Sequence, residues 1–598
     1  MDRKGILGLI LIVALFGTWE FYYIRKSSEA AAAQKQIEAE TAAQEAANPK
    51  PAPAILEATG AAPKTVAQPS AAEKTETLKT KAAEYAFTNL GGGIQRATLL
   101  DHLAENGAQV ALNQFGKTAI GALSESAGDD TGAIFAARPD AASGKIAFER
   151  TDERQVQIVK EFTLPKYDEL KGADRLREEF LLTLDLTFSN RSDKPITLPT
   201  YWLHTGSSAP IHQRDQPIYT AFNFLKTNSN KAVNVTWFKG SGFLFFKSGP
   251  KTVYPEKPEP LTDVRWAGVA NQYFTTLFTP LVDPKAMNDE QVRQRGVGVW
   301  ARHFPVDDEA WQAAGHPTTD TGEREGIEGA LGMSGCTLKP GETIRRSFHL
   351  YAGPREYRRL RELGDYEAEM MDFGMFAIVS KTLLNSMNFL KGVLGNYAFA
   401  IVLLTLVIKT ALWPLQNKAT SSMKKMQALQ PKMNELREKY KDNPTAMNTE
   451  TMKLYKQYGV NPFGGCFPML VQIPIFLGFY NMLGKAVELR NAKFLWVHDL
   501  SMPDTIFSVL GFPVNVLPLC MAVTMLWSMS LQPKSGDQTQ QRMMMIVPLI
   551  FIYFCYNYAS ALALYFTVQN LFSIVQLYVT RNQNTPAPQK VIPPKTKR

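Results

Sequence analysis

The chain has 598 residues, of which 45% are hydrophobic and 20% charged, and its formal net charge is +9. These averages resemble those of a soluble protein, but the apolar residues concentrate at positions 5–23 and after position 395. The basic residues gather between and after the apolar segments, which indicates membrane topology rather than a surface for nucleic acid. The 4 cysteines are too scattered for a disulfide framework. The composition therefore predicts a membrane protein with a large aqueous insertion.

Residues 1–26 predict a transmembrane anchor. A short basic start precedes an apolar run from Gly5 to Trp19, which continues into aromatic residues at 21–23. A cleaved signal peptide is the alternative, but no suitable small-residue cleavage site follows the run. We therefore expect an uncleaved anchor with a cytoplasmic N-terminus. Residues 27–82 are rich in Ala, Pro, Glu, Lys and Gln without apolar periodicity, and we expect a disordered linker there.

In residues 83–355 apolar side chains recur at every second position, which is typical of half-buried strands. Apolar and polar residues alternate from Phe180 to Phe188, with Leu181 as the one break, and again from Ile344 onward. Turn signals rich in Gly, Asn and Pro recur between such runs. The pattern predicts a large antiparallel β-sandwich domain.

No catalytic motif stands out in this β domain. It contains no GxxxxGK[ST] loop, no HExxH, no CxxC and no GxSxG. His204 and His212 lie near Asp215, but we expect lone histidines in a sandwich to be structural. The sequence therefore predicts no enzyme activity, no catalytic residue, and no cofactor, metal or nucleotide site.

Residues 356–394 are helical in pattern, and from Phe376 onward apolar residues recur at spacings of three and four. We expect an amphipathic helix along the membrane interface, with packing under the β domain as the alternative. Residues 395–415 then form a span that carries one lysine, Lys409. A charge in hydrocarbon costs a few kcal/mol, so Lys409 is a candidate functional residue unless it snorkels to water.

Residues 416–463 predict a cytoplasmic helical hairpin. They hold nine basic and four acidic residues, an excess that places a loop on the cytoplasmic side. Helix formers flank a turn at 442–444. Met423, Met426 and Met433 line one predicted helix, either as core residues or as a pliable docking surface.

Residues 464–580 hold four further apolar segments, at 467–483, 512–529, 543–558 and 559–579. The loop after the first segment is charge-balanced and is predicted outside, whereas the basic tail at 581–598 is predicted in the cytoplasm. Six transmembrane helices with both termini inside satisfy every loop and leave the β domain outside. The predicted fold class is an α-helical polytopic membrane protein with a large antiparallel β-sandwich domain.

Polar residues cluster at similar depth in the cytoplasmic half of three predicted spans. Several share one helical face, because they recur at spacings of three, four and seven residues. The predicted set is Lys409, Thr405, Gln472, Gln569, Ser573 and Gln576. Scattered packing residues are the alternative, but the shared depth favours a wet recess that opens to the cytoplasm beneath apolar packing.

Several motifs resemble those of the YidC-type membrane protein insertases and their mitochondrial and chloroplast relatives. These motifs are Asn461-Pro462-Phe463-Gly464-Gly465-Cys466-Phe467-Pro468, Gln472-Ile473-Pro474-Ile475-Phe476, Val487-Glu488-Leu489-Arg490, His498-Asp499-Leu500 and Leu429-Gln430-Pro431-Lys432. The layout of anchor, linker and β domain resembles the Gram-negative bacterial branch of that family.

The resemblance implies an inner-membrane insertase that inserts and helps fold newly made membrane proteins without ATP, alone or with a Sec-type translocon. It implies that the last five helices form a conserved core and that the β domain is periplasmic. The implied partners are nascent membrane proteins, the lipid bilayer, the ribosome, and targeting factors such as the SRP receptor.

The resemblance also implies roles for side chains. A cation in the family's first core span lies in a hydrophilic groove, and Lys409 matches that position, where bacterial members commonly have arginine. The turn at 559–561 is Ala-Ser-Ala, where the family often has Pro-Ser-Gly. The implied slide for a substrate helix, along the outside of the bundle, comprises Ile475, Phe476, Tyr565 and Phe566. The implied docking residues of the hairpin are Lys424, Lys425, Lys432, Arg437, Met423 and Met426.

Two other classes of protein stay open as alternatives. A small-molecule transporter predicts polar residues through both membrane halves and internal repeats, and the sequence shows neither. A membrane-anchored periplasmic chaperone or carbohydrate-binding β-domain protein needs only one span and leaves the core motifs unexplained.

Overall fold

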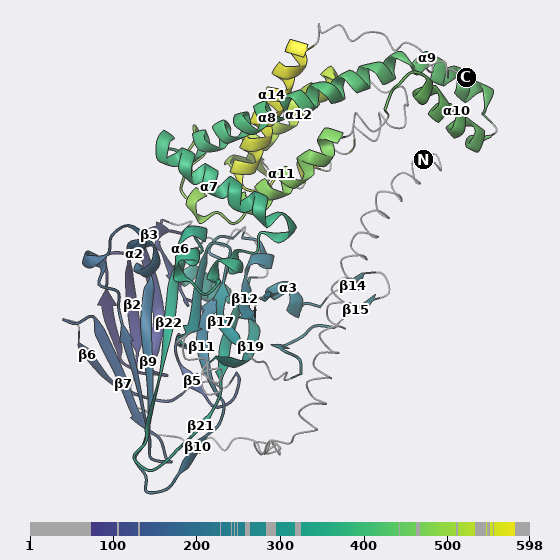
Figure 1. Cartoon of the computed structure of the whole chain (residues 1–598). Coiled ribbons are helices and arrows are strands. Elements are labelled where there is room, and N and C mark those ends of the chain that lie inside the picture. The colour runs from purple at the N-terminus through teal and green to yellow at the C-terminus, as the bar shows by residue number, and fades with distance from the viewer. Residues whose placement is uncertain are drawn as a thin grey trace, which may run out of the picture.

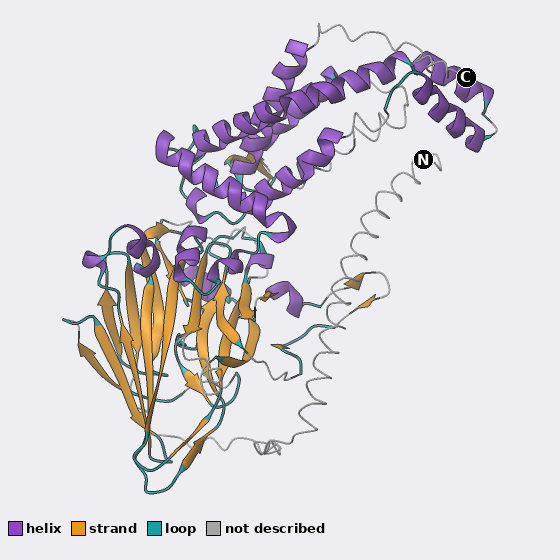
Figure 2. Cartoon of the chain, viewed as in Figure 1, coloured by secondary structure: helices purple, strands orange, loops and turns teal. Residues whose placement is uncertain are grey.

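The computed structural model describes residues 73–580, in which a β domain is joined to a helical bundle (Figures 1 and 2). The gaps in this range are 105–106, 129–131, 141, 214, 228, 241, 244–245, 248, 258–262, 283–294, 317–323, 442, 462–466, 510–511, 533–545, 547–550 and 554. The predicted N-terminal anchor, the linker up to residue 72, the basic tail and half of the segment at 543–558 lie outside the described residues.

A four-stranded antiparallel sheet opens the β domain. Its strands, in spatial order, are β1 (Thr75–Lys79), β2 (Ala83–Thr88), β3 (Gly93–Leu103) and β4 (Gln109–Leu112). Strand β1 corrects the predicted linker, which extended to residue 82. Only Leu78 of β1 is buried, so no alternation marks this strand in the sequence, and its backbone pairing with β2 holds it in place.

The second sheet has 14 strands, all paired antiparallel. They are β5 (Leu123–Ser124), β6 (Ala136–Asp140), β7 (Lys145–Thr151), β8 (Val156–Thr163), β9 (Leu181–Asn190), β11 (Tyr201–Ser208), β12 (Ala221–Lys226), β13 (Ser229–Asn234), β16 (Val253–Tyr254), β17 (Val264–Ala270), β18 (Phe274–Pro280), β19 (Gly296–Pro305), β20 (Glu325–Met333) and β22 (Thr343–Pro354). Smaller pairs are β10 (Ile196–Leu198) with β21 (Cys336–Leu338), β14 (Gly242–Phe243) with β15 (Phe246–Lys247), and β23 (Thr505–Val509) with β24 (Phe512–Asn515). The prediction of a large antiparallel β domain is confirmed.

The large sheet folds back on itself to form two layers. Strands β17 and β19 meet at a single register pair, Val264 opposite Gly296, so the sheet bends between them. Across the layers, the Thr276 hydroxyl on β18 donates to the backbone oxygen of Thr205 on β11 at 2.6 Å. The strand predicted from its alternation is β9, in which Leu182, Leu184, Leu186 and Phe188 are all buried.

The region predicted as one amphipathic helix at 356–394 is divided into pieces. These are α6 (Tyr357–Leu363), η4 (Glu367–Met371), η5 (Gly374–Phe376) and α7 (Ala377–Leu394). Four residues with positive φ interrupt the helix, namely Gly364, Tyr366, Asp372 and Gly374. The prediction of a single helix is therefore wrong, because left-handed backbone cannot continue an α-helix.

The buried face of α7 packs on the helical bundle. Leu384 and Met387 are fully buried, and Ser380 donates to the backbone oxygen of Gly478 at 3.1 Å. On the other side, Ile378 is 84% exposed and Phe389 is 71% exposed. An apolar outer face of this kind fits a position along lipid, which stays a prediction.

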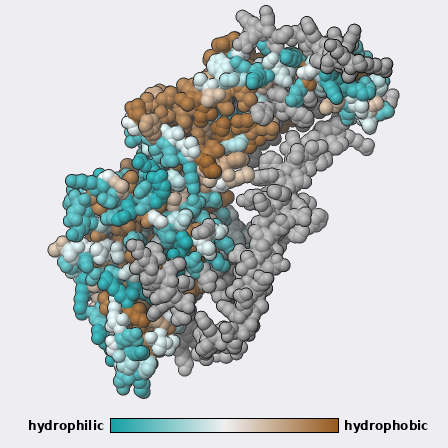
Figure 3. Space-filling view, viewed as in Figure 1, coloured by the Kyte–Doolittle hydropathy of each residue, from teal (hydrophilic) through white to brown (hydrophobic). Residues whose placement is uncertain are grey.

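The bundle contains α8 (Tyr397–Ala428), α11 (Phe467–Leu483), α12 (Val516–Leu531) and α14 (Ser560–Thr580). Among the described residues, α8 and α14 are long and apolar enough to cross a membrane, whereas α11 and α12 are shorter apolar helices. Their surface is the main hydrophobic area in Figure 3. The predicted count of six spans stays a prediction.

Helix α8 runs 13 residues past the predicted end of its span at 415, and then α9 (Gln430–Lys439) and α10 (Pro444–Gln457) form the hairpin. The Asn443 side chain caps α10 by accepting from the Ala446 amide at 3.0 Å, at the predicted turn. Met423 and Met426 lie on α8, whereas Met433 lies on α9, so the three do not line one helix as predicted.

The remaining helices are short. They are η1 (Tyr167–Glu169), α2 (Gly172–Glu178), η2 (Pro217–Tyr219), α3 (Val235–Phe238), α5 (Asp308–Ala313) and η7 (Val487–Leu489).

Side chains fix the β domain to the loop that follows α11. The Gln272 amide donates to the backbone oxygen of Gly484 at 2.7 Å. Arg490 donates to the backbone oxygen of Leu103 and lies over the Tyr273 ring at 5.0 Å. These contacts hold the two parts together at a defined junction.

Candidate functional site: a polar network across three helices

Lys409 lies where α8 meets α14. Its Nζ donates to the hydroxyl oxygen of Ser573 at 3.4 Å, and Ser573 in turn donates to the backbone oxygen of Gln569 at 2.9 Å. Lys409 is partly buried, and its ammonium lies at the contact of the two helices. The structure therefore brings together two residues that the sequence places 164 positions apart.

Gln472 joins α11 to the same face of α14. Its Nε2 donates to the Tyr565 hydroxyl at 3.0 Å and to Oε1 of Gln569 at 3.1 Å. Since Gln569 also accepts from Ser573 through its backbone, the polar contacts form a chain from α8 through α14 to α11.

Gln576 forms a second contact between α14 and α8, nearer the hairpin. Its Nε2 donates to Oδ1 of Asn417 at 3.2 Å and lies 3.5 Å from the backbone oxygen of Trp413. Thr405 is buried, and its hydroxyl donates to the backbone oxygen of Ile401 on its own helix at 2.7 Å. Five of the six predicted residues thus make contacts between helices, and Thr405 instead bonds within α8.

The burial of α14 changes along its length. The residues from Ser560 to Tyr565 are all buried, whereas those from Phe566 to Ser573 are half-buried or exposed. The polar network begins where the tight packing ends. The predicted recess beneath apolar packing stays a prediction.

The residues predicted as an outer slide pack against one another. Phe476 lies 5.6 Å from Phe566 between ring centroids, and Tyr565 stacks on Phe479 at 4.1 Å. Tyr565 is only 2% exposed, so its predicted place on the outer surface is wrong: its ring fills the α11–α14 contact and its hydroxyl belongs to the polar network. Ile475 is half-buried.

The hairpin lysines differ in their surroundings. Lys424 donates to the backbone oxygen of Thr580 at 3.2 Å and so ties α8 to the end of α14. Lys432 donates to the Tyr458 hydroxyl and lies over that ring at 4.4 Å. Lys425 and Arg437 are half-buried. Their docking role stays a prediction.

Asn417 and Tyr565 are network residues that the sequence analysis missed. The predicted span ends at residue 415, so Asn417 falls in the predicted cytoplasmic hairpin and not in the span. The helix-favouring composition of 416–428 was the available signal that α8 continues. Within the described part of the chain, no group of three His, Cys, Asp or Glu residues is placed to hold a metal ion.

Comparisons with known proteins decide the family. The family model described as the YidC periplasmic domain matches residues 76–385, which is more than half of the chain. The chain belongs to the YidC family. The family model described as 60Kd inner membrane protein matches residues 389–587. Membership in the YidC family identifies the β domain as periplasmic and the helical part as an inner-membrane region.

Curated relatives match part of the chain. A "Membrane protein insertase YidC" of Geobacter sulfurreducens is 40% identical over 261 residues, which cover 43% of this chain and 48% of the relative. The protein of the same name from Pelobacter propionicus is 33% identical over 327 residues, 54% of this chain and 55% of the relative. The chain thus spans about half the length of the curated relatives it matches.

A solved structure is also similar. The "Active YidC insertase crystal structure with the first transmembrane domain resolved" is 16% identical, with a TM-score of 0.33, and the match covers 86% of this chain and 94% of that chain.

Proposed function

We propose that this YidC-family chain inserts newly made proteins into the inner membrane and helps them fold. The observation that carries the proposal is the polar network in which Lys409 of α8 meets Ser573 of α14. A lysine, three glutamines and a serine in otherwise apolar helices are costly unless they serve a polar ligand or each other. The names of the matched relatives support the same function.

The physical task is to move a hydrophilic tail or loop through hydrocarbon, where every unpaired polar group costs several kcal/mol. A hydrophilic groove open to the cytoplasm shortens that path, and Lys409 attracts acidic residues of the incoming tail. The apolar helix of the substrate then enters lipid beside the bundle and gains burial energy. This proposal involves no covalent chemistry, ATP or other nucleotide.

The proposal includes a topology and partners. The basic hairpin and tail lie in the cytoplasm, with both termini, by the excess of basic residues there. The hairpin, with Lys425, Lys432 and Arg437, docks the ribosome or targeting factors such as the SRP receptor. The chain acts alone or beside a Sec-type translocon.

Purified chain in liposomes, without ATP or Sec proteins, tests the function. The substrate is a short membrane protein with an acidic N-terminal tail, and protease protection of the tail reports insertion. We expect Lys409→Ala to slow insertion by about tenfold, which corresponds to one lost charge contact, and Lys409→Arg to retain it. Lys418→Ala, at an exposed position on the same helix, is the matched control.

A second comparison changes the substrate and not the insertase chain. A version whose acidic tail residues are changed to Asn and Gln should insert equally well with wild-type and Lys409→Ala chains. Wild-type rates for Lys409→Ala with the acidic tail would exclude the charge mechanism. Absence of any insertion by the wild-type chain would exclude autonomous, ATP-independent insertion.

A further inference from the structure

The hairpin formed by β23 and β24 exposes apolar side chains to its surroundings. Every residue of β23 is exposed, and so is Phe512 at the start of β24. Phe507 is 55% exposed and Phe512 is 77% exposed, and Ile506 and Val509 are exposed to a similar extent. A strand that packs on a protein core buries every second residue. Within the described part of the chain, therefore, no layer packs on β23.

The base of the hairpin is fixed to the bundle. The Thr505 hydroxyl donates to Oδ1 of Asn515 at 2.6 Å, and the Asn515 amide donates to the backbone oxygen of Tyr556 at 2.7 Å. The Tyr556 hydroxyl in turn donates to the backbone oxygen of Pro513 at 2.7 Å. The exposed side chains therefore occupy a defined place beside the helices, among which Figure 2 shows this strand pair in orange.

The hairpin lies at the periplasmic end of the bundle. The loop that precedes it contacts the β domain, because Gln272 donates to the backbone oxygen of Gly484 at 2.7 Å and the Tyr273 hydroxyl lies 3.5 Å from that of Ser501. The helix that follows is α12, which begins at Val516. Since membership in the YidC family makes the β domain periplasmic, the end of the bundle beside it meets the outer leaflet of the inner membrane.

Helix α12 is too short to cross the hydrocarbon by itself. Its 16 residues span about 24 Å, whereas the hydrocarbon core is about 30 Å thick. Apolar side chains on its surface are exposed, namely those of Leu519, Val523, Leu526 and Trp527. No Asp, Glu, Lys, Arg or His occurs from Thr505 to Gln532. The uncharged surface of the hairpin thus continues the uncharged surface of α12 toward the periplasm.

Backbone hydrogen bonding limits how deep the hairpin can lie. Two paired strands leave the N–H and C=O groups of their outer edges unpaired, and hydrocarbon does not tolerate such groups. Aromatic side chains favour the boundary between headgroups and acyl chains. The hairpin carries Phe507 and Phe512, and Trp496 of the preceding loop donates to Asp504 at 3.0 Å. These features fit the boundary, where water reaches the strand edges and apolar side chains reach the acyl chains.

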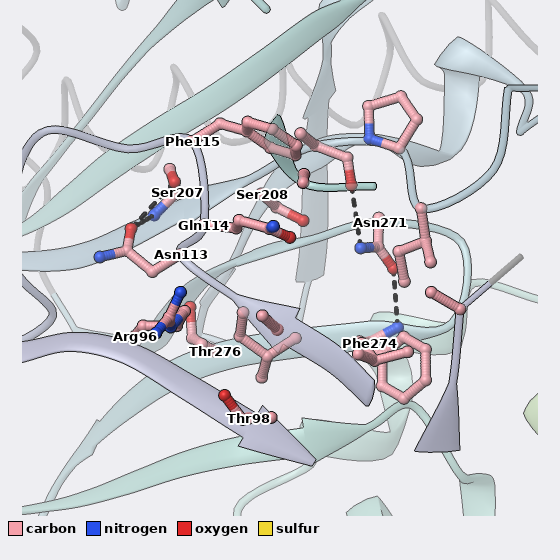
Figure 4. Close-up of a pocket in the computed structure, with 18 of the residues that line it drawn as sticks. Arg96, Thr98, Asn113, Gln114, Phe115, Ser207, Ser208, Asn271, Phe274 and Thr276 are labelled. Carbon is pink, nitrogen blue, oxygen red and sulfur yellow. Dashed lines mark hydrogen bonds between the residues drawn. The ribbon is translucent and has the colours of Figure 1, made fainter. Parts of the chain in front are cut away.

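A cleft of about 350 Å³ in the β domain has a different character (Figure 4). Its walls carry bonded polar side chains: Asn113 accepts from the Ser207 amide at 2.8 Å, and Asn271 accepts from the Phe274 amide at 2.9 Å. Between its base residues the hairpin has one polar side chain, that of Ser508. Water therefore suits the cleft, and an apolar medium suits the hairpin.

From these observations we propose that the β23–β24 hairpin inserts its apolar side chains into the outer leaflet, with its backbone at the boundary of headgroups and acyl chains. The partner of this surface is phospholipid and not another protein. The contact holds the junction of the bundle and the β domain at a fixed depth in the membrane. The proposal depends on the membrane location of the bundle and is independent of the insertion activity.

Photocrosslinking from the hairpin tests the contact. The full chain is reconstituted in vesicles of phosphatidylethanolamine and phosphatidylglycerol, and Phe507→p-benzoylphenylalanine places a light-activated ketone on β23. The excited ketone abstracts hydrogen from a nearby C–H bond and the two radicals then join, so no group leaves. We expect a product with the mass of the chain plus one phospholipid, in at least about tenfold higher yield than from a position in water.

The matched control is Leu281→p-benzoylphenylalanine. Leu281 is 37% exposed and follows the end of β18 that lies seven residues, about 23 Å, from the junction. It should give no phospholipid adduct. Val523→p-benzoylphenylalanine, at an exposed position on α12, is the positive control for folding and reconstitution. A crosslinked pair of chains from Phe507, or no lipid adduct there when Val523 gives one, would overturn the proposal.

Hydroxyl-radical oxidation of the wild-type chain in nanodiscs gives a readout that needs no variant. After correction for the reactivity of each residue type, Phe507 and Phe512 should be oxidised at least about tenfold more slowly than Leu281, because the bilayer excludes the water in which the radical forms. Equal corrected rates would contradict the proposal. A chain that gives the phospholipid adduct but inserts no substrate leaves this proposal standing and refutes only the proposed function.

Discussion

The side-chain amide of Gln472 on α11 donates to Oε1 of Gln569 on α14 at 3.1 Å. This bond and the bond to the Tyr565 hydroxyl link two helices that are otherwise held by aromatic packing, such as the stack of Phe479 on Tyr565. The polar network therefore contributes to the packing of the bundle as well as to any groove.

Gln472→Leu removes both bonds and leaves the Tyr565 hydroxyl and Gln569 without this donor. We expect a loss of about 1 kcal/mol, because hydrogen bonds between membrane helices are worth about that much. Thermal unfolding in detergent measures the loss. Ile473→Leu, at the neighbouring exposed position, is the control, and equal unfolding temperatures of the two variants would contradict the prediction.

The junction should be sensitive to pH through Glu488, which lies outside the spans. Burial and the neighbouring Glu356 raise the pKa of Glu488 to about 7 from 4.5, while Asn388 donates to it at 3.2 Å and Arg358 acts weakly against the rise. The folded state thus holds this proton more tightly than the unfolded state. Stability therefore falls as the pH rises from about 4.5 to about 7.

Glu488→Gln keeps the size of the side chain and removes the titration. We expect its unfolding temperature to exceed that of the wild type at pH 8 and to match it near pH 5, where the wild-type carboxyl is largely protonated. Glu450→Gln, in an exposed pair with Lys453 on the hairpin, is the control. If the unfolding temperatures of wild type and Glu488→Gln differed by the same amount at both pH values, Glu488 would not be the group that titrates.

Arg490→Met should loosen the attachment of the β domain. The change removes a charged donor from the Leu103 carbonyl, a loss of about 2 kcal/mol, and leaves the side-chain stem to pack on Tyr273. We expect faster amide exchange at residues 99–104. Lys493→Met, at an exposed position in the same loop, should leave that exchange unchanged.

Gly329→Ala tests the contact between the two layers of the sandwich. A Cβ at this position would lie 2.2 Å from the Phe222 ring, which is fully buried and cannot move aside. Overpacking of this kind costs about 1–3 kcal/mol. Gly249→Ala, where an added Cβ meets open space, should be neutral in thermal unfolding. Equal stability of the two variants would show that the layers separate more easily than the structure implies.

The sequence predicts those elements in which the periodicity of the apolar residues matches the pattern of buried positions. Alternation identified β9 because every second residue from Leu182 to Phe188 is buried, and similar depth in the predicted spans grouped Lys409 with Ser573, which the structure brings into contact. Alternation did not predict β1, because this edge strand has only one buried residue. There the backbone ladder, which has no signature in side-chain pattern, holds the strand.

Backbone geometry explains the other differences. Gly364 and Gly374 were available signals for breaks in the region before α7, but Tyr366 and Asp372 adopt positive φ without being glycine, which sequence pattern rarely reveals. Tyr565 was assigned to an outer surface only through the resemblance to the insertase family. Which face of an apolar helix meets protein and which meets lipid depends on the partner helices, and hydropathy is the same for both.

Helix α8 continues without a break from Tyr397 to Ala428, about 48 Å at 1.5 Å per residue. Lys409 therefore lies on the same continuous helix to which the hairpin is attached, so a tilt of the helix moves both. A partner that tilts the hairpin changes the separation of Lys409 from Ser573 unless the rod bends at Pro414, the proline inside the helix. We therefore expect a partner bound to the hairpin to shift Lys409 relative to Ser573 as long as α8 stays straight.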